Sequence, residues 1–272
     1  MERVARRLRT VDGVVGLVLG GSRALGVTDP EADVDVGVLY SASRRPDSAD
    51  LRAAAAELDD RGAPDGFGDY GEWGPWINGG AWLSVAGFKT DLLWREVELV
   101  ESVIADCHDG RVTSHYQPGH PHAFLNCIYM AELHHNVVLF DRDGTVARLR
   151  EATVPYPAPM RDAIVRTFGW EAGFALDVAG SPALRGNVAY VSGCLYRAAA
   201  CMAQVLFAAN ERYLLNEKRG VPDAAGLERV PDAFAERVEA VLAAPGRDAR
   251  ELTGAIAALR ELHDEVRAIA SG

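Results

Sequence analysis

Cysteine is scarce in this sequence, which limits the kinds of site the chain can build. The 272 residues include only four cysteines, at positions 107, 127, 194 and 201. Their spacings match no paired metal-ligand motif, and Cys194 and Cys201 lie in a segment of helical periodicity. We therefore expect the thiols to pack in the interior, without disulfides and without a cysteine metal site.

Long apolar runs are also missing. Charged or amide side chains interrupt every apolar stretch well before the roughly 18 residues that a membrane helix needs. The first ten residues, MERVARRLRT, contain no apolar signal core. The sequence therefore predicts a cytoplasmic protein with no membrane contact.

The chain lacks an excess of basic charge. It has 28 Lys and Arg against 39 Asp and Glu, a formal net charge of −11. Proteins that bind a long polyanion over a broad surface usually carry a basic patch, so we expect no extended nucleic acid as a partner. The acidic balance is compatible with a small cationic substrate. Because 49% of the residues are apolar, the chain can form a sizeable core.

A glycine turn and two acids stand out near the N-terminus. The unbroken apolar run Val14 to Leu19 predicts a buried strand, and it ends at Gly20-Gly21-Ser22, where glycines permit a tight turn and Ser22 can cap a helix. The helix start and its backbone N–H groups can receive a phosphate. The next strand, Asp33 to Tyr40, alternates between valines on one face and Asp33, Asp35 and Gly37 on the other.

Asp33 and Asp35 are therefore expected on one face, with alpha carbons about 6.5 to 7 Å apart. Two carboxylates at that distance can converge on a divalent cation, and Mg²⁺ prefers such oxygen ligands together with substrate phosphates. Burial of both acids without a cation would cost several kcal/mol each. A half-exposed strand whose acids face water is the alternative. A third acid, Asp91, lies in the strand-like segment Ala81 to Val97.

The stretch "LGGSRALG" followed by "DVDV" resembles the signature of the polymerase-β-like nucleotidyltransferase superfamily, with ten residues between Ser22 and Asp33. Within that superfamily the chain is most similar to bacterial small-molecule nucleotidyltransferases, including the aminoglycoside type. The resemblance implies two Mg²⁺ ions held by Asp33 and Asp35. It also implies a third acid, Asp91, as metal ligand or general base, and Glu96 and Glu132 are rival bases.

The implied activity is Mg²⁺-dependent transfer of a nucleoside monophosphate, with AMP from ATP as the favoured donor, to a hydroxyl of a small molecule such as an aminoglycoside-like antibiotic. Gly21, Ser22 and Arg23 are expected to bind the triphosphate, and Lys218 is a further candidate for a phosphate or acceptor contact. Two alternatives stay open. One is a non-catalytic nucleotide-binding protein of the antitoxin type, and the other is a nucleotidyltransferase with a protein or RNA acceptor. The oligomeric state is also open.

The resemblance and the element pattern predict an α/β (α+β) nucleotidyltransferase domain with a mixed sheet in residues 1–154, followed by an all-α helical bundle in residues 155–272. The boundary falls in "VPYPAP", which has three prolines in six residues. The segment Gly62 to Gly80 is glycine-rich and aromatic, and we expect an irregular loop that faces the substrate. For His115, His120 and His122 a surface or packing role is favoured over a zinc site or a lining of the acceptor cleft.

Overall fold

The computed structural model describes residues 1–26, 32–215 and 217–272, and it divides the chain into two compact units. The first unit comprises residues 1–107, 113–119 and 123–155. The second comprises residues 156–272 together with the short segments 108–112 and 120–122. Part of the interval between the glycine turn and Asp33, residues 27–31, lies outside the described residues.

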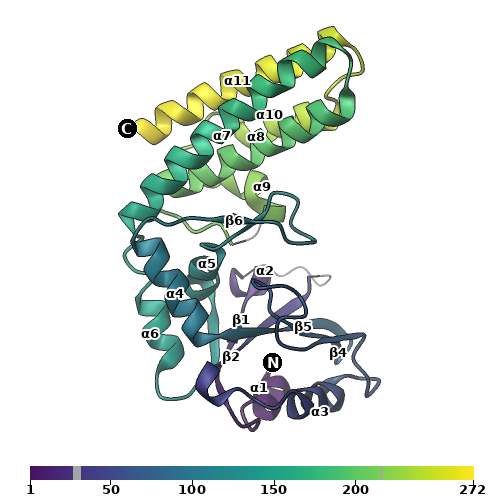
Figure 1. Cartoon of the computed structure of the whole chain (residues 1–272), viewed down its shortest axis with the longest axis vertical. Helices are drawn as coiled ribbons and strands as arrows, with labels where there is room; N and C mark the ends of the chain where they lie inside the picture. The colour runs from purple at the N-terminus through teal and green to yellow at the C-terminus, as the bar shows by residue number, and fades with distance from the viewer. Residues whose placement is uncertain (27–31, 216) are drawn as a thin grey trace. The chain divides into compact units, whose positions relative to one another are not determined.

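The first unit is built on a six-stranded sheet with the strand order β3-β4-β5-β2-β1-β8 (Figure 1). Only β2 and β5 pair in parallel among the described pairs of this sheet, so the predicted mixed sheet is confirmed. The strands are β1 Val14–Leu19, β2 Val34–Tyr40, β3 Gly66–Gly68, β4 Gly80–Val85, β5 Phe88–Glu96 and β8 Val137–Asp141. A separate short pair consists of β6 Ser114–His115 and β7 Phe124–Leu125.

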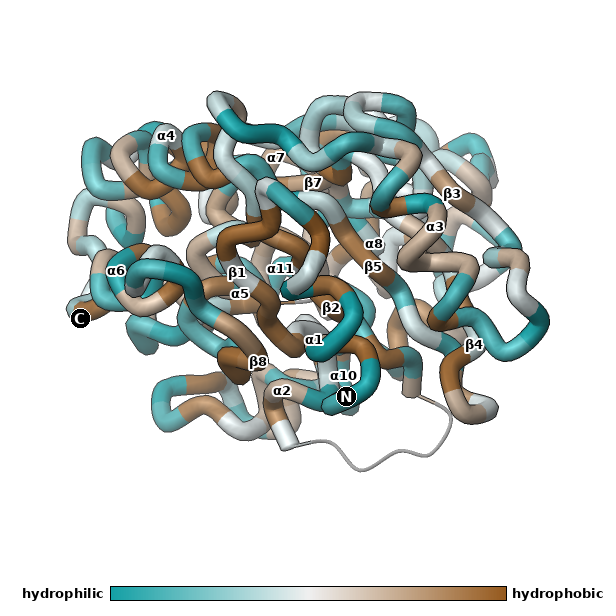
Figure 2. Tube along the Cα trace, turned by 90° about the horizontal axis from the view of Figure 1, so that it is seen from below, coloured by the Kyte–Doolittle hydropathy of each residue, from teal (hydrophilic) through white to brown (hydrophobic). Residues whose placement is uncertain are grey.

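Helices α1 and α3 cover one face of this sheet (Figure 1). The alternation of β2 directs Val34, Val36 and Val38 into a core with α1 and α3, while the acids take the opposite face. Figure 2 shows the hydrophobic colour running along β1, β2 and β5. The helical elements up to Glu151 are α1 Glu2–Leu8, α2 Gly21–Ala24, η1 Ala42–Arg44, α3 Ser48–Leu58, α4 Val97–His108, α5 Ile128–His135 and α6 Thr145–Glu151.

The second unit is helical, as the sequence predicts. Its elements are α7 Ala158–Leu184, α8 Val188–Ala209, η2 Glu217–Arg219, α9 Gly220–Ala224, α10 Phe234–Ala243 and α11 Ala249–Ser271. Helix α7 continues through Pro182 and ends two residues later, at Leu184. A proline this close to a helix end removes only one of the last backbone hydrogen bonds.

Helix α8 is the most apolar helix of the second unit. By length and composition it could cross a membrane, with a mean hydropathy of 1.3 in its best window. However, 67% of that window is buried inside the protein. Burial in the bundle is therefore sufficient to explain its apolar composition.

The segment Gly62 to Gly80 is more ordered than the sequence suggests. Near its start it forms β3, which pairs antiparallel with β4. Farther along, Asn78 donates from Nδ2 to the hydroxyl of Tyr40 at 2.8 Å, and Tyr70 donates to the carbonyl of Pro46 at 3.0 Å. The prediction of an irregular loop is therefore wrong for residues 66–68, which form a strand, and these bonds hold the rest of the segment to the sheet.

Candidate active site

Asp35 and Asp91 occupy neighbouring positions on one face of the sheet. The parallel register of β2 and β5 pairs Asp35 directly with Asp91. Paired residues of adjacent strands project to the same face, and the strands lie about 4.8 Å apart. Both acids are half-buried, on the face opposite the valine core.

Asp33 continues the alternation one residue before β2 begins, and its side chain is exposed. In the part of the chain that the structure describes, no three His, Cys, Asp or Glu side chains are grouped closely enough to hold a metal ion. The three predicted acids therefore belong to one face and one end of the strands, without forming a preassembled three-ligand cluster.

The donor chemistry of this face nevertheless fits a divalent cation. Mg²⁺ is usually held by one or two carboxylates, with substrate phosphates and water completing the oxygen shell. Asp35 and Asp91 supply two neighbouring carboxylates on a half-buried surface, where two anions disfavour one another's charge unless a cation is shared. Asp33 adds a third carboxylate at the exposed margin. These residues fit Mg²⁺ bound jointly with a triphosphate.

The turn Gly20–Ser22 lies directly against Asp35. The N–H of Gly20 donates to the Asp35 carbonyl at 2.8 Å. Gly21 has a positive φ of 61°, and a Cβ built on it would stand 1.7 Å from Oδ2 of Asp35. Only glycine combines this backbone conformation with so close an approach to a carboxylate. The turn does start a helix as expected, but α2 has only four residues. The groups available to donate hydrogen bonds to a phosphate are therefore the N–H groups of the turn and the Ser22 hydroxyl.

Arg23, predicted to bind phosphate, contacts the segment that carries Asp33. Its Nη2 and Nε donate to the carbonyl of Ala32 at 2.7 and 3.1 Å, and Nε is also 3.3 Å from the carbonyl of Asp33. The guanidinium lies over the ring of Phe88 at 5.4 Å. These contacts give Arg23 a positioning role at the start of β2, while phosphate binding stays a prediction.

A buried ion pair stands on the same face as Asp91. Arg95 donates two hydrogen bonds to the Glu132 carboxylate, from Nε to Oε2 at 2.9 Å and from Nη2 to Oε1 at 2.8 Å. Burial is the largest single influence on the pKa of Arg95 and lowers it, but the Glu132 carboxylate, with smaller contributions from Tyr129 and Asp35, raises that pKa above its ordinary value. Since both oxygens of Glu132 accept from Arg95, this rival base has a structural partner.

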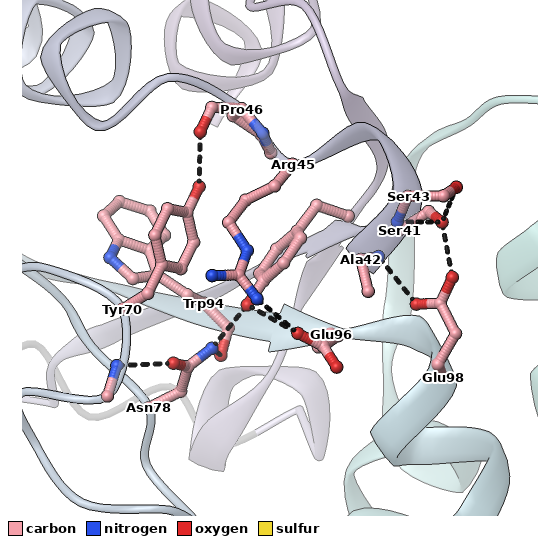
Figure 3. Close-up of polar contacts among 12 residues, drawn as sticks. Ser41, Ala42, Ser43, Arg45, Pro46, Tyr70, Asn78, Trp94, Glu96 and Glu98 are labelled. Atoms are coloured by element: carbon pink, nitrogen blue, oxygen red, sulfur yellow. Dashed lines mark hydrogen bonds and ion pairs between the residues drawn. The ribbon is translucent and has the colours of Figure 1, made fainter.

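Glu96, the other rival base, lies on the face opposite Asp91, since side chains alternate along β5. Figure 3 shows it beside Arg45, whose Nη2 donates to Oε2 at 3.1 Å. The Tyr40 hydroxyl is 3.5 Å from the same oxygen. Of the three candidate bases, Asp91 is the one that the register places beside Asp35.

Two tryptophans extend the acidic face, and the sequence reasoning missed them. The antiparallel register of β4 and β5 pairs Trp82 with Asp91. Trp82 is 50% exposed and stacks on Trp73, with ring centroids 4.9 Å apart and planes 27° apart. The available signal in the sequence was the period of two, in which Trp82 shares a face with Ser84 and alternates with Ala81 and Leu83.

The three loop histidines make separate packing contacts. His115 packs against Trp76 with ring centroids 4.3 Å apart and the rings tilted by 33°, and its Nε2 is 2.8 Å from the Thr113 hydroxyl. In the second unit, the Nδ1 of His120 is 3.7 Å from Glu217. His122 is buried there against Arg197. No metal-binding group forms among the described residues, so these contacts support the packing interpretation.

Lys218 belongs to the second unit, in the short helix η2, and its side chain is exposed. The other predicted binding residues, Gly21, Ser22 and Arg23, belong to the first unit. The structure therefore brings together the turn and the acids, and the role of Lys218 stays a prediction.

Comparisons with known proteins agree with this geometry. Residues 1–66 match the family model of the nucleotidyltransferase domain. That segment contains the glycine turn, Asp33 and Asp35, and it ends before Asp91. The match shows that this segment resembles a nucleotidyltransferase domain, and it supports a nucleotidyl transfer activity.

Among solved structures, the chain is similar to a nucleotidyltransferase-like protein from Exiguobacterium sibiricum 255-15. The identity is 10%, the alignment covers 97% of this chain and 74% of that chain, and the TM-score is 0.45. A comparison with curated proteins finds no match.

Proposed function

We propose that the protein is a Mg²⁺-dependent nucleotidyltransferase that moves AMP from ATP to a hydroxyl group of a small molecule, such as an aminoglycoside-like antibiotic. The observation that carries the proposal is the pairing of Asp35 with Asp91 beside the close-packed turn at Gly21. Together these groups offer carboxylates for a cation and N–H donors for the phosphates that the cation accompanies. The nucleotidyltransferase match over residues 1–66 supports the same chemistry.

The order of groups across the sheet gives the reaction a direction. Gly20, Asp35, Asp91 and Trp82 form one row across four neighbouring strands. With strands about 4.8 Å apart, the row spans about 14 Å. In-line displacement places the entering and leaving oxygens on opposite sides of the α-phosphorus. Pyrophosphate therefore leaves on the side of the glycine turn, and the acceptor hydroxyl enters on the side of Asp91.

The residues of the row then have distinct tasks. Asp91 accepts the proton of the acceptor hydroxyl as its oxygen bonds to the α-phosphorus. The bond from that phosphorus to the bridging oxygen breaks, and the electron pair leaves with pyrophosphate. The turn Gly20–Ser22 orients the phosphates through its N–H groups. Mg²⁺, when bound by Asp33 and Asp35, would neutralise the charge on the phosphate oxygens.

The alternatives differ in the role of Asp91, in whether the nucleotide is transferred at all, and in the class of acceptor. If Asp91 is a metal ligand and no base, proton removal falls to solvent, and the pH dependence of kcat loses the contribution of that carboxyl. A non-catalytic nucleotide-binding protein of the antitoxin type would bind ATP and release it unchanged. A nucleotidyltransferase with a macromolecular acceptor would label a protein or an RNA.

One labelling experiment separates these functions. The purified chain is incubated with Mg²⁺ and ATP labelled on the α-phosphate, with aminoglycosides, proteins and RNAs as acceptors. We expect label on a small acceptor, inhibition by EDTA and restoration by Mg²⁺. The variant Asp33→Asn should require more Mg²⁺, whereas Asp50→Asn, an exposed acid on α3, serves as the matched control. Label transfer that Asp33→Asn leaves unchanged at limiting Mg²⁺ would overturn the metal assignment.

Lys218 is tested separately, because it belongs to the second unit. Replacement by alanine should raise the KM of ATP or of the acceptor if its cation binds either one. The neighbouring Arg219 is paired with Asp223 at 2.6 Å, so Arg219→Ala is a suitable control in the same short helix. Unchanged KM values for Lys218→Ala would remove this residue from the binding site.

A further inference from the structure

The strongest unassigned feature is the stacked pair Trp73 and Trp82 at the acidic end of the row. Trp82 pairs with Asp91 across β4 and β5, so its indole and the carboxylate project to the same face from adjacent strands. Half of the Trp82 surface is exposed, although its ring is the largest side chain on that strand. The row therefore ends in an aromatic surface next to the proposed base.

The chain makes room for this pair with glycines. A Cβ on Gly66 would stand 2.7 Å from the Trp82 ring. A Cβ on Gly68 would stand 2.2 Å from the Trp73 ring, and one on Gly80 would stand 2.8 Å from it. Because any side chain at these positions would displace an indole, the glycines define where the two rings lie at the edge of the sheet.

Two hydrogen bonds also hold the backbone of Trp73 in place. The buried Gln117 donates from Nε2 to the Trp73 carbonyl at 3.1 Å, and the Trp73 N–H donates to the carbonyl of Asn78 at 3.0 Å. Two stacked indoles held in this way present a ready-made surface, which lowers the entropic cost of binding a ligand.

The tryptophan pair belongs to the more acidic part of the chain. Residues 1–155 contain 15 Lys and Arg against 24 Asp and Glu, whereas residues 156–272 contain 13 against 15. Asp91 stands beside Trp82 in the row, and Asp35 follows on the next strand. Tryptophan faces attract cations more strongly than the other aromatic rings do, and carboxylates add to that attraction. The surface is complementary to a ring that carries both apolar C–H groups and protonated amines.

We propose that the Trp73–Trp82 pair is the acceptor-binding surface, and that it selects a small amine-bearing, polyhydroxylated ring. This inference rests on the proposed function, since the in-line geometry assigns the Asp91 side of the row to the acceptor. The saturated ring packs on the Trp82 indole, its ammonium groups lie near the indole face and the acids, and one hydroxyl reaches Asp91. Trp82 is a specificity residue, and the bonds that change in the reaction remain those at the α-phosphorus.

The test uses the full chain with neomycin as the cationic ring and myo-inositol as an uncharged polyol. Binding of each is measured by calorimetry without nucleotide, and transfer from ATP is measured by steady-state kinetics. We expect Trp82→Ala to weaken neomycin binding and to raise the acceptor KM about tenfold or more, in line with a lost cation–π contact. The KM of ATP should stay unchanged, and Trp82→Phe should give an intermediate effect.

Two further variants guard against a general folding defect. Gly66→Ala keeps Trp82 but introduces a Cβ 2.7 Å from its ring, so it should also weaken neomycin binding. Trp170→Ala removes a more exposed indole, 65% exposed and stacked on Phe174 in the helical unit, and it should change nothing. Circular dichroism verifies that each variant is folded.

The outcomes separate this inference from the proposed function. Neomycin binding that Trp82→Ala leaves intact overturns the inference even if the wild-type chain transfers AMP. The inference is also overturned if the wild-type chain fails to bind neomycin, binds myo-inositol equally well, or shows a raised ATP KM in Trp82→Ala. Neomycin binding that depends on Trp82 in a chain that transfers no label supports the surface and refutes the transferase.

Discussion

Gly21 and Asp35 approach so closely that a single methyl group on Gly21 would stand 1.7 Å from the Asp35 carboxylate. The backbone at Gly21 has a φ of 61°, a conformation that costs a non-glycine residue about 1 to 2 kcal/mol. The turn and the acid therefore form one structural unit, and its integrity depends on the absence of a side chain.

Gly21→Ala should abolish transfer, because the new Cβ displaces the Asp35 carboxylate. Steady-state kinetics and thermal unfolding measure activity and stability in parallel. Gly26→Ala is the matched control, since Gly26 also has a positive φ, of 77°, but among the described residues no atom lies within 4 Å of the added Cβ. Both variants should lose similar stability, and Gly21→Ala alone should lose activity. Equal activity in the two variants would contradict the role of this contact.

Asp91→Asn should lower kcat by about 10² to 10⁴, the range typical of a removed general base. The rival assignment is tested by Glu96→Gln, because Glu96 lies on the other face of β5 and accepts from Arg45. That variant should keep most of its kcat. The idea of Asp91 as base fails if the two substitutions have the same effect on kcat at saturating substrates.

Glu132→Ala should destabilise the first unit by about 3 kcal/mol, because it leaves the Arg95 guanidinium buried without its carboxylate. The side chain of Arg95 is 6% exposed and that of Glu132 is 31% exposed. Because Glu132 is only partly buried, we expect the loss of stability at the lower end of the range for buried ion pairs. Chemical denaturation measures the free energy of unfolding. The double variant Arg95→Met/Glu132→Leu should recover much of the loss. A fully stable Glu132→Ala protein would show that the pair contributes little.

His122 should make the stability of the helical unit depend on pH. Burial, together with the nearby Arg197, lowers the pKa of His122 from 6.5 to about 4 in the folded chain. As the pH falls from about 6.5 to 4, the unfolded chain gains a proton that the folded chain does not accept. Stability is therefore full above pH 6.5 and decreases below it, by up to about 3 kcal/mol.

Denaturation of the wild-type chain and of His122→Gln at pH 7.5, 5.5 and 4.5 measures this contribution. The variant should lose less stability between pH 7.5 and 4.5 than the wild-type chain does. His108→Gln, which replaces an exposed histidine, should keep the wild-type pH dependence. Parallel pH profiles for His122→Gln and the wild-type chain would mean that His122 has the same pKa in the folded and the unfolded chain.

Local patterns in the sequence were sufficient for the strands around the glycine turn and for the helical second half, whereas the mixed sheet also required the family resemblance. The alternation of valines and acids in β2 has a period of two, which by itself places Asp33 and Asp35 on one face. Helix α7 shows the limit of such patterns. Pro182 looks like a terminator, yet the helix continues past it because the penalty falls on its last turn.

The sequence patterns could not predict which residues lie next to those acids. Residue spacing does not fix which strands pair or in what register, so the pairing of Asp35 with Asp91 and of Asp91 with Trp82 exists only in the folded sheet. The same holds for Glu132, whose role is set by Arg95, 37 residues away. The sequence determined which residues carry the chemistry, because side-chain type and strand period are local properties. The tertiary structure decided which of them meet, because strand order and register depend on packing between distant segments.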